Sequence, residues 1–280
     1  MSEKWVYRFD EGDASMKGLL GGKGANLAEM SRMGLPVPPG FTITTRACNA
    51  WLASGGQMPE GLMDQVQAAL ADVEAATGKR LGDPDAPLLL SVRSGARFSM
   101  PGMMDTVLNL GLNRDTLGGL IRATGDERFG YDANRRFVMM FSDVVLGLPK
   151  ARFEQILTRY KRQAGVKEDT QLGVTPLKAL CNDSLALVLQ ETGAGFPGDP
   201  MKQLVMAIEA VFQSWNNERA VIYRRRERIP DDLGTAVNIQ AMVFGNLGLD
   251  SGSGVAFTRD PATGERALYG EYLMNAQGED

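Results

Sequence analysis

The spacing of hydrophobic and polar residues predicts alternating short helices and strands in the N-terminal part of the chain. Helices are predicted over residues 27–33 and 61–76, and strands over residues 41–44, 88–92 and 107–112. Gly34 and Gly78 follow the two helices, as expected of residues that end helices. The segment between the last two strands begins at Arg93, and the pattern predicts a loop there.

The hydrophobic spacing is helical from residue 113 to residue 199. Helices are predicted over residues 134–148, 151–164 and 177–190. No chemical motif is present in this stretch, which favours a structural helical insert. Asp199 and Pro200 then predict the capped start of another helix, and its apolar stripe is typical of one buried face: Met201, Leu204, Val205, Ile208, Val211, Phe212 and Trp215.

The C-terminal part returns to extended patterns. A strand is predicted over residues 236–244, and a hairpin over residues 254–258 and 267–273. The turn residues of this hairpin form the run Asp260-Pro261-Ala262-Thr263-Gly264. The predicted order is therefore short helices and strands, a helical segment, one further helix, and then strands.

Composition narrows the classes of function. The chain has 280 residues, 44% of them hydrophobic and 23% charged, which suits a globular protein of about two domains. A net charge of −4 argues against general nucleic-acid binding, and we interpret the cluster Arg224–Arg228 as a solvated helix end. No signal peptide is evident, and no apolar run approaches the ~20 residues that span a bilayer, so no membrane partner is expected.

Cysteine and histidine usage limits the possible chemistry. Cys48 and Cys181 fit no metal or disulfide spacing, which favours reduced thiols and a cytoplasmic location, with Cys48 in the core. The sequence contains no histidine. A Ser–His–Asp triad, a histidine zinc site and a phosphohistidine carrier are therefore all excluded within this chain.

Two segments suggest an anionic ligand. Arg93 and Arg97 stand four residues apart in a stretch of Ser, Gly and Pro, and a guanidinium fork matches phosphate oxygens. The alternative is an arginine that ties down a turn through a nearby carboxylate. The second segment places Lys23 in a glycine run at a helix start, where backbone N–H groups and the helix dipole also favour anions.

The glycine–lysine segment is not a Walker A loop. That pattern requires glycine where Lys17 stands and serine or threonine where Gly24 stands. A purely structural glycine-rich turn therefore remains an alternative interpretation of this segment taken alone.

Together, these segments resemble the start of the pyruvate, phosphate dikinase family. The resemblance is carried by Gly21–Leu27, Ser91–Ala96, Met100–Thr106, Asn238–Asn246, Gly254–Arg259 and Gly270–Asp280. It runs from the first residues to the last and is least distinctive around residues 112–200. Members of this family continue without a break past the position that matches Asp280, so the resemblance implies a truncated nucleotide-binding domain.

The resemblance implies an α+β, ATP-grasp-like fold, in which ATP lies between two subdomains. The first would comprise residues 1–112 with 200–243, a helical insert residues 113–199, and the start of the second subdomain residues 244–280. Lys23 and Arg93 would contact the ATP phosphates as the catalytic cations. Further nucleotide contacts are implied at Arg97, Gly102, Met104, Asp105, Thr106, Gln240, Met242, Val243, Glu271 and Gln277.

These further contacts have structural alternatives. Residues 240–243 match the strand beside the adenine, where backbone groups read the base edge and Met242 packs on the ring, but an ordinary buried strand has the same residue types. Glu271 and Gln277, with Asn275, would face the cleft from the last strand. Glu271 is equally compatible with a surface position.

The family's full reaction converts ATP, inorganic phosphate and pyruvate into AMP, pyrophosphate and phosphoenolpyruvate through a phosphohistidine on another domain. The implied cofactors are ATP and Mg²⁺, with the strongest metal carboxylates expected past residue 280. The partners would be ATP and the missing phosphohistidine and pyruvate domains. We expect the full-length enzyme to be a dimeric phosphotransferase, and this chain alone to be monomeric and inactive.

Three other functions fit the sequence less well. A phosphoenolpyruvate synthase-type dikinase would use water in place of phosphate, but the residues from Arg93 to Thr106 resemble the phosphate-dependent branch more closely. A non-catalytic nucleotide-binding module is disfavoured because Lys23 and Arg93 are both present. A helical interaction protein would require every motif match to be a coincidence.

Overall fold

The computed structural model describes residues 3–278 and divides the chain into two units, residues 1–242 and 243–280. Each unit is described by itself. The first contains a five-stranded sheet with helices around it, and the second contains a two-stranded sheet. The chain is therefore mixed α and β, as the sequence pattern predicts.

The sheet of the first unit is antiparallel throughout, with the strand order β1-β2-β5-β3-β4. Its strands are β1 (Val6–Arg8), β2 (Gly40–Ile43), β3 (Leu90–Gly95), β4 (Thr106–Leu110) and β5 (Ala236–Ala241). The central strand β5 therefore comes from the end of this unit. It pairs with β2 and β3 across long stretches of chain.

The predicted loop start at Arg93 is wrong. β3 continues to Gly95, and Arg93 is paired with Asn238 of β5 on one side and Thr106 of β4 on the other. Ladder pairing on both sides holds this residue in the sheet. The loop occupies residues 96–105 instead.

The two faces of the sheet differ in polarity. Residues opposite one another in antiparallel strands share a face, so Thr42, Asn238 and Arg93 form a polar row across β2, β5 and β3. The next row, Phe41, Ile239 and Val92, faces the other side and is fully buried. One face is thus built for packing and the other carries polar groups.

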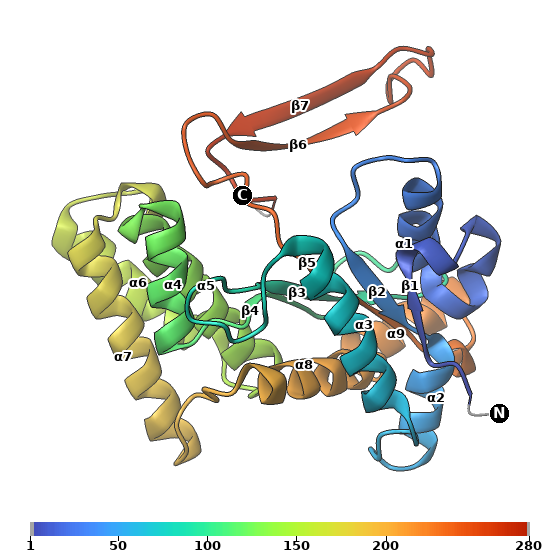
Figure 1. Cartoon of the computed structure of the whole chain (residues 1–280). Helices are drawn as coiled ribbons and strands as arrows, with labels where there is room; N and C mark the ends of the chain where they lie inside the picture. The colour runs from blue at the N-terminus through green and yellow to red at the C-terminus, as the bar shows by residue number, and fades with distance from the viewer. Residues whose placement is uncertain (1–2, 279–280) are drawn as a thin grey trace. The chain divides into compact units, whose positions relative to one another are not determined.

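Helix α8 (Pro200–Ser214) lies against β3, β4 and β5 on the side of the sheet opposite α1 (Lys17–Arg32) (Figure 1). Its apolar residues Leu204, Ile208 and Phe212 are fully buried. The Asp199 side chain accepts a hydrogen bond from the amide of Met201, so the predicted cap is confirmed. Helix α1 contacts the central strands, and its Gly24 lies against the polar row.

Three further helices surround this sheet: α2 (Thr45–Ala53), α3 (Leu62–Thr77) and α9 (Glu218–Glu227). Short 3₁₀ turns occur at Phe9–Glu11, Ala14–Met16, Asp169–Gln171 and Asp231–Leu233. Cys48 of α2 is fully buried, and burial raises the pKa of its thiol to about 12. The prediction that Cys48 belongs to the core is therefore confirmed.

The arginine cluster at the end of α9 is only partly solvated, so its interpretation as a solvated helix end is wrong for Arg224. The Arg224 guanidinium is buried, lies 4.1 Å from the centroid of the Trp215 ring and pairs with Asp231 at 2.8 Å. It also donates to the Trp215 carbonyl. Arg225 and Arg226 are exposed, as predicted.

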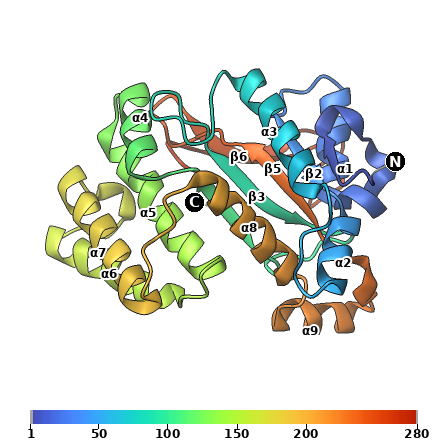
Figure 2. The same cartoon turned by 60° about the horizontal axis from the view of Figure 1, so that its bottom comes forward.

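The helical part comprises α4 (Arg114–Thr124), α5 (Glu127–Val144), α6 (Lys150–Ala164) and α7 (Val174–Thr192), which group together at one end of the unit (Figure 2). Helix α5 begins seven residues earlier than predicted because Asp126 caps it by accepting from the amide of Phe129. None of the helices among residues 3–278 is long and apolar enough to cross a membrane.

The second unit contains the predicted hairpin. β6 (Gly252–Phe257) pairs antiparallel with β7 (Tyr269–Met274). The turn is closed by the Gly264 amide, which donates to the Asp260 carbonyl at 2.8 Å, and by the Ala262 amide, which donates to the Asp260 side chain at 2.7 Å.

Candidate functional site

The glycine–lysine segment forms a kink inside helix α1. Helical structure begins at Lys17, is interrupted at Gly21 with φ 69° and ψ 171°, and then continues to Arg32. A Cβ on Gly21 would lie 1.7 Å from the carbonyl oxygen of Gly95, so no other residue fits here without displacing the end of β3. The amide of Gly22 donates to the Ala96 carbonyl at 2.9 Å. The helix is thereby attached to the end of β3.

Gly24 permits the second close approach. A Cβ at this position would lie 2.8 Å from Thr42 Oγ1 and 2.9 Å from Asn238 Oδ1. Thr42 Oγ1 donates to Asn238 Oδ1 at 3.0 Å, and Asn238 Nδ2 is buried without a hydrogen-bond partner among the described residues. Helix α1 therefore rests directly on the polar row of the sheet.

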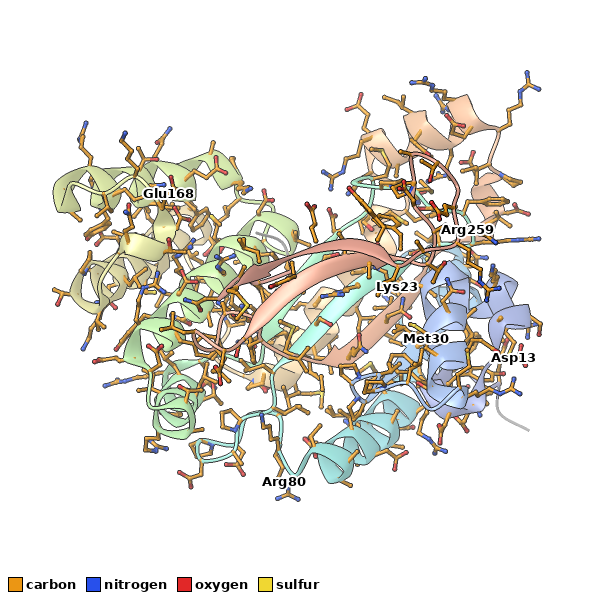
Figure 3. The ribbon with its side chains drawn as sticks, turned by 90° about the horizontal axis from the view of Figure 1, so that it is seen from above. Asp13, Lys23, Met30, Arg80, Glu168 and Arg259 are labelled. Atoms are coloured by element: carbon orange, nitrogen blue, oxygen red, sulfur yellow. The ribbon has the colours of Figure 1, made fainter. Side chains whose placement is uncertain are left out.

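Lys23 lies in the first turn after this kink, on the side of α1 that faces the strands (Figure 3). Its Cβ lies 3.7 Å from the position that a Cβ would take on Gly95. The side chain remains exposed to solvent, yet the surrounding protein atoms, and then the positive charge of Arg93, hold the pKa of its ammonium below the ordinary 10.5. The surrounding protein and the Arg93 charge thus both disfavour the charged form of Lys23.

The arrangement of Lys23 and Arg93 suits an anionic ligand. Among residues 3–278, no carboxylate forms an ion pair with Lys23, and the charge that acts on it is the cation Arg93. The helical segment that starts after Gly21 directs the positive end of its dipole to the same place. Two converging cations at a helix start can bind a polyanion such as a chain of phosphates.

Apolar contacts fix the loop between β3 and β4 onto the core. Ala96 and Met100 belong to a buried cluster with Trp215 and Ala220, and Met104 packs against that cluster. Met104, which the family resemblance implies as a nucleotide contact, thus has a packing role in this structure. The neighbouring loop residues Arg97–Ser99 and Pro101–Gly102 are exposed.

A second set of contacts fixes the same loop through Asp105. Its carboxylate pairs with the guanidinium of Arg219 and accepts from Asn217 Nδ2 at 3.0 Å, while Arg219 Nε donates to the Met103 carbonyl at 3.1 Å. Burial raises the pKa of Asp105, and the charge of Arg219 opposes that shift. An arginine does tie down this turn through a carboxylate, but the arginine is Arg219.

The sequence pattern does not reveal the part played by Arg219 and Asn217. Asn217 immediately precedes helix α9 and Arg219 lies in its first turn, more than 100 residues after the loop. Neither belongs to a recognisable motif. No local signal in the sequence could have paired them with Asp105.

The tip of the loop carries the third candidate cation. Arg97 is exposed, and its guanidinium lies 5.7 Å from the centroid of the neighbouring Phe98 ring. Gly102 has φ 71° and open space around it. Thr106 begins β4 and is the cross-strand partner of Arg93. Arg97 and Gly102 therefore face solvent between two firm attachments.

The residues predicted beside the adenine are engaged within the fold. The amide of Met242 donates to the Leu89 carbonyl at 2.9 Å, and Gln240 Nε2 donates to the Pro38 carbonyl at 3.0 Å. Hydrogen bonds to an adenine edge would therefore have to come from groups other than the Met242 amide and the Gln240 side-chain amide. The half-buried side chain of Met242 remains available for packing.

The remaining predicted contacts belong to the second unit. Val243 is its first residue, and Glu271 lies in β7 opposite Val255. Gln277 Oε1 accepts from the amide of Gly245 at 3.3 Å. The predicted site residues are thus distributed over both units of the chain.

The described residues contain no group of three or more His, Cys, Asp or Glu side chains that could hold a metal ion. The cysteines are free and buried, and burial raises the pKa of the Cys181 thiol to about 11. Neither thiol is therefore suited to act as a nucleophile or a ligand.

Comparison with known proteins identifies relatives across the whole chain. A family described as "Pyruvate phosphate dikinase, AMP/ATP-binding domain" matches residues 17–60 and 54–280. The pyruvate, phosphate dikinase of Clostridium symbiosum is 55% identical over 278 residues, which cover 99% of this chain and 32% of that protein. Chloroplastic pyruvate, phosphate dikinase 1 of Arabidopsis thaliana is 55% identical over 284 residues, covering 100% and 29%. The chain spans 29–32% of the length of these relatives.

Proposed function

The chain belongs to the pyruvate, phosphate dikinase AMP/ATP-binding domain family, and we propose that Lys23 and Arg93 bind the phosphates of ATP in it. The observation that supports this assignment is the placement of two cations at a helix start, with no carboxylate paired to Lys23 among the described residues. A phosphate chain would supply a negative partner to Lys23.

The two cations would play different parts. Arg93 is held within β3 between two strands, so its planar fork is presented in a fixed direction. Lys23 carries a point charge on a flexible stem and can follow a moving phosphoryl group. Arg97, on the loop tip, would add a third positive charge above the phosphates.

We further propose an ATP-grasp-like arrangement. Residues 1–112 and 200–243 would form the first subdomain, residues 113–199 a helical insert, and residues 244–280 the start of the second subdomain. Residues 240–243, Glu271 and Gln277 would contribute further nucleotide contacts. The family membership supports this proposal.

The reaction proposed for the full-length protein is that of a dikinase. ATP and phosphate would yield AMP and pyrophosphate while one phosphoryl group passes to a histidine and then to pyruvate, giving phosphoenolpyruvate. That histidine must lie elsewhere in the protein, because these 280 residues contain none. Phosphoryl transfer depends mainly on positioning and on cations where negative charge develops, and Lys23 and Arg93 would provide both.

Magnesium is proposed as a companion of the ATP phosphates. The described residues offer no cluster of three metal-ligating side chains, so we assign no magnesium ligand within this chain. When bound to the nucleotide, Mg²⁺ would neutralise phosphate charge in addition to the two side chains. We also propose a cytoplasmic location, a monomeric isolated chain and a dimeric full-length enzyme; the buried free thiols support a reducing compartment.

Calorimetric titration with ATP and Mg²⁺ tests the site assignment. Lys23→Ala and Arg93→Ala should each weaken binding about tenfold to a hundredfold, because a charge-assisted hydrogen bond contributes roughly 1.5–3 kcal/mol. Lys17→Ala is the matched control, since Lys17 is an exposed lysine at the start of the same helix. It should bind as the wild type does.

Equal binding by the wild type, Lys23→Ala and Arg93→Ala would refute the site. A wild-type chain that does not bind would refute the proposal that this part binds ATP by itself. We also expect no AMP production from ATP, phosphate and pyruvate by this chain, because it lacks the phosphoryl-accepting histidine. Production of AMP would overturn the proposal that the reaction needs a histidine outside this chain.

A further inference from the structure

The helical part contains a cavity of about 720 Å³ between α4, α5, α7 and residues 196–198. Much of its wall is apolar: Leu112, Leu117, Ile121, Val138, Leu185 and Phe196. This volume and this predominance of apolar lining are typical of sites that bury most of a small organic molecule. None of its lining residues belongs to the Lys23–Arg93 site.

The charged residues at this cavity have one sign. Lys178 and Arg114 line it, and no carboxylate does among the described residues. Neither cation forms an ion pair within residues 3–278, and Lys178 Nζ lies 5.8 Å from the centroid of the Tyr131 ring. The chain as a whole has a net charge of −4, so a local excess of two positive charges beside an apolar cavity is a distinct feature. It is complementary to an anionic group.

The deep wall is polar but uncharged. Asn134 and Cys181 are both buried, and the Cys181 thiol donates to the Tyr131 carbonyl at 3.5 Å. Burial keeps that thiol protonated, because it raises the thiol pKa to about 11. A ligand would therefore meet neutral hydrogen-bonding groups inside and positive charge only at Lys178 and Arg114.

We propose that this cavity binds a small amphipathic anion, with an apolar body of one or two rings and a single carboxylate, sulfonate or phosphate group. The apolar body would lie among the leucines and Phe196, and the anionic group would lie between Lys178 and Arg114. This site is separate from the proposed ATP site, and its ligand class does not depend on the dikinase reaction.

Fluorescence titration with 8-anilinonaphthalene-1-sulfonate, an amphipathic anion, tests the proposal. N-phenyl-1-naphthylamine serves as the uncharged counterpart. The double variant Arg114→Gln/Lys178→Gln should weaken binding of the sulfonate about tenfold, because two partly exposed charge pairs are lost, and should leave the neutral probe unaffected. Leu185→Trp narrows the cavity and should weaken both probes.

The matched control is Arg162→Gln/Lys167→Gln, which removes two exposed cations that do not line the cavity. It should bind both probes as the wild type does, and thermal melting should show that every variant folds. The absence of saturable sulfonate binding by the wild type would overturn the proposal. So would an equal loss of binding in the control, or displacement of the probe by ATP with Mg²⁺.

Discussion

Two regions of this protein contain closely spaced cations, and the electrostatic surroundings of these cations differ. In α5, the Arg135 guanidinium is almost fully buried and is neutralised by Asp132 at 2.7 Å and Asp169 at 3.1 Å. After the kink in α1, the charged group that affects the pKa of Lys23 is another cation, Arg93. In the first region, carboxylates of the protein itself neutralise Arg135. In the second, no carboxylate among residues 3–278 pairs with Lys23.

This difference supports a structural role for the Arg135 cluster and agrees with the proposed phosphate-binding role of Lys23. A buried ion pair is destabilising to break, so the Arg135 cluster holds α5 to the segment that contains Asp169. Lys23 has no carboxylate partner among residues 3–278, and a charged group of this kind is a candidate for binding an anionic ligand.

Removing the carboxylate at the centre of the buried cluster should have the largest effect. Asp132→Ala leaves Arg135 without its closest partner and also removes an ion pair with Arg136. We expect a loss of about 3–5 kcal/mol in the free energy of unfolding, measured by urea denaturation. The control Asp85→Ala breaks the exposed pair with Arg122 and should cost less than about 1 kcal/mol. Similar losses in the two variants would contradict the assigned role of the cluster.

Adding a side chain where α1 contacts the end of β3 should have the next largest effect. Gly21→Ala places a Cβ against the Gly95 carbonyl in a left-handed conformation, and we expect a loss of about 2–4 kcal/mol in stability together with weaker ATP binding. Gly18→Ala in the same helix has open space and should be neutral or slightly stabilising. Denaturation and calorimetry of both variants check this, and an unchanged Gly21→Ala protein would refute the close approach.

Loosening the loop between β3 and β4 should have a moderate effect that falls mainly on binding. Arg219→Gln removes the ion pair with Asp105 while the apolar contacts of Met100 and Met104 remain. We expect ATP affinity to fall about threefold to fivefold, because a partly exposed ion pair contributes about 1 kcal/mol or less. Arg219→Lys should restore part of the affinity. An affinity equal to that of the wild type would mean that the loop contributes nothing to binding.

Removing the lysine charge should have the smallest effect on stability, and its sign is the informative result. The pKa of Lys23 is lowered in the folded protein, so the folded state binds fewer protons than the unfolded state as pH rises through that lowered pKa. Wild-type stability should therefore rise in that alkaline window, and Lys23→Gln should be slightly more stable below it. Denaturation of both proteins from neutral to alkaline pH measures this. A less stable variant would show that Lys23 is paired rather than repelled.

Much of this organisation follows from short-range patterns in the sequence. The glycine run around Lys23, the Asp199–Pro200 cap and the hairpin turn at Asp260 are local signals, because they depend on backbone conformations and contacts a few residues apart. The resemblance of these motifs to a known family also predicts Lys23 and Arg93 as joint phosphate contacts, although 70 residues of chain separate them.

Other features depended on the tertiary structure alone. Packing pairs Asp105 with Arg219 and buries Arg224 against Trp215. It also places the Met242 amide where it donates to the Leu89 carbonyl. No sequence pattern revealed that Arg93 lies within a strand, because that depends on β4 and β5 pairing on either side of it. The sequence determines which residues can bend, cap or carry charge. Only the folded chain decides which distant group neutralises each charge, because electrostatic partners are set by proximity in space.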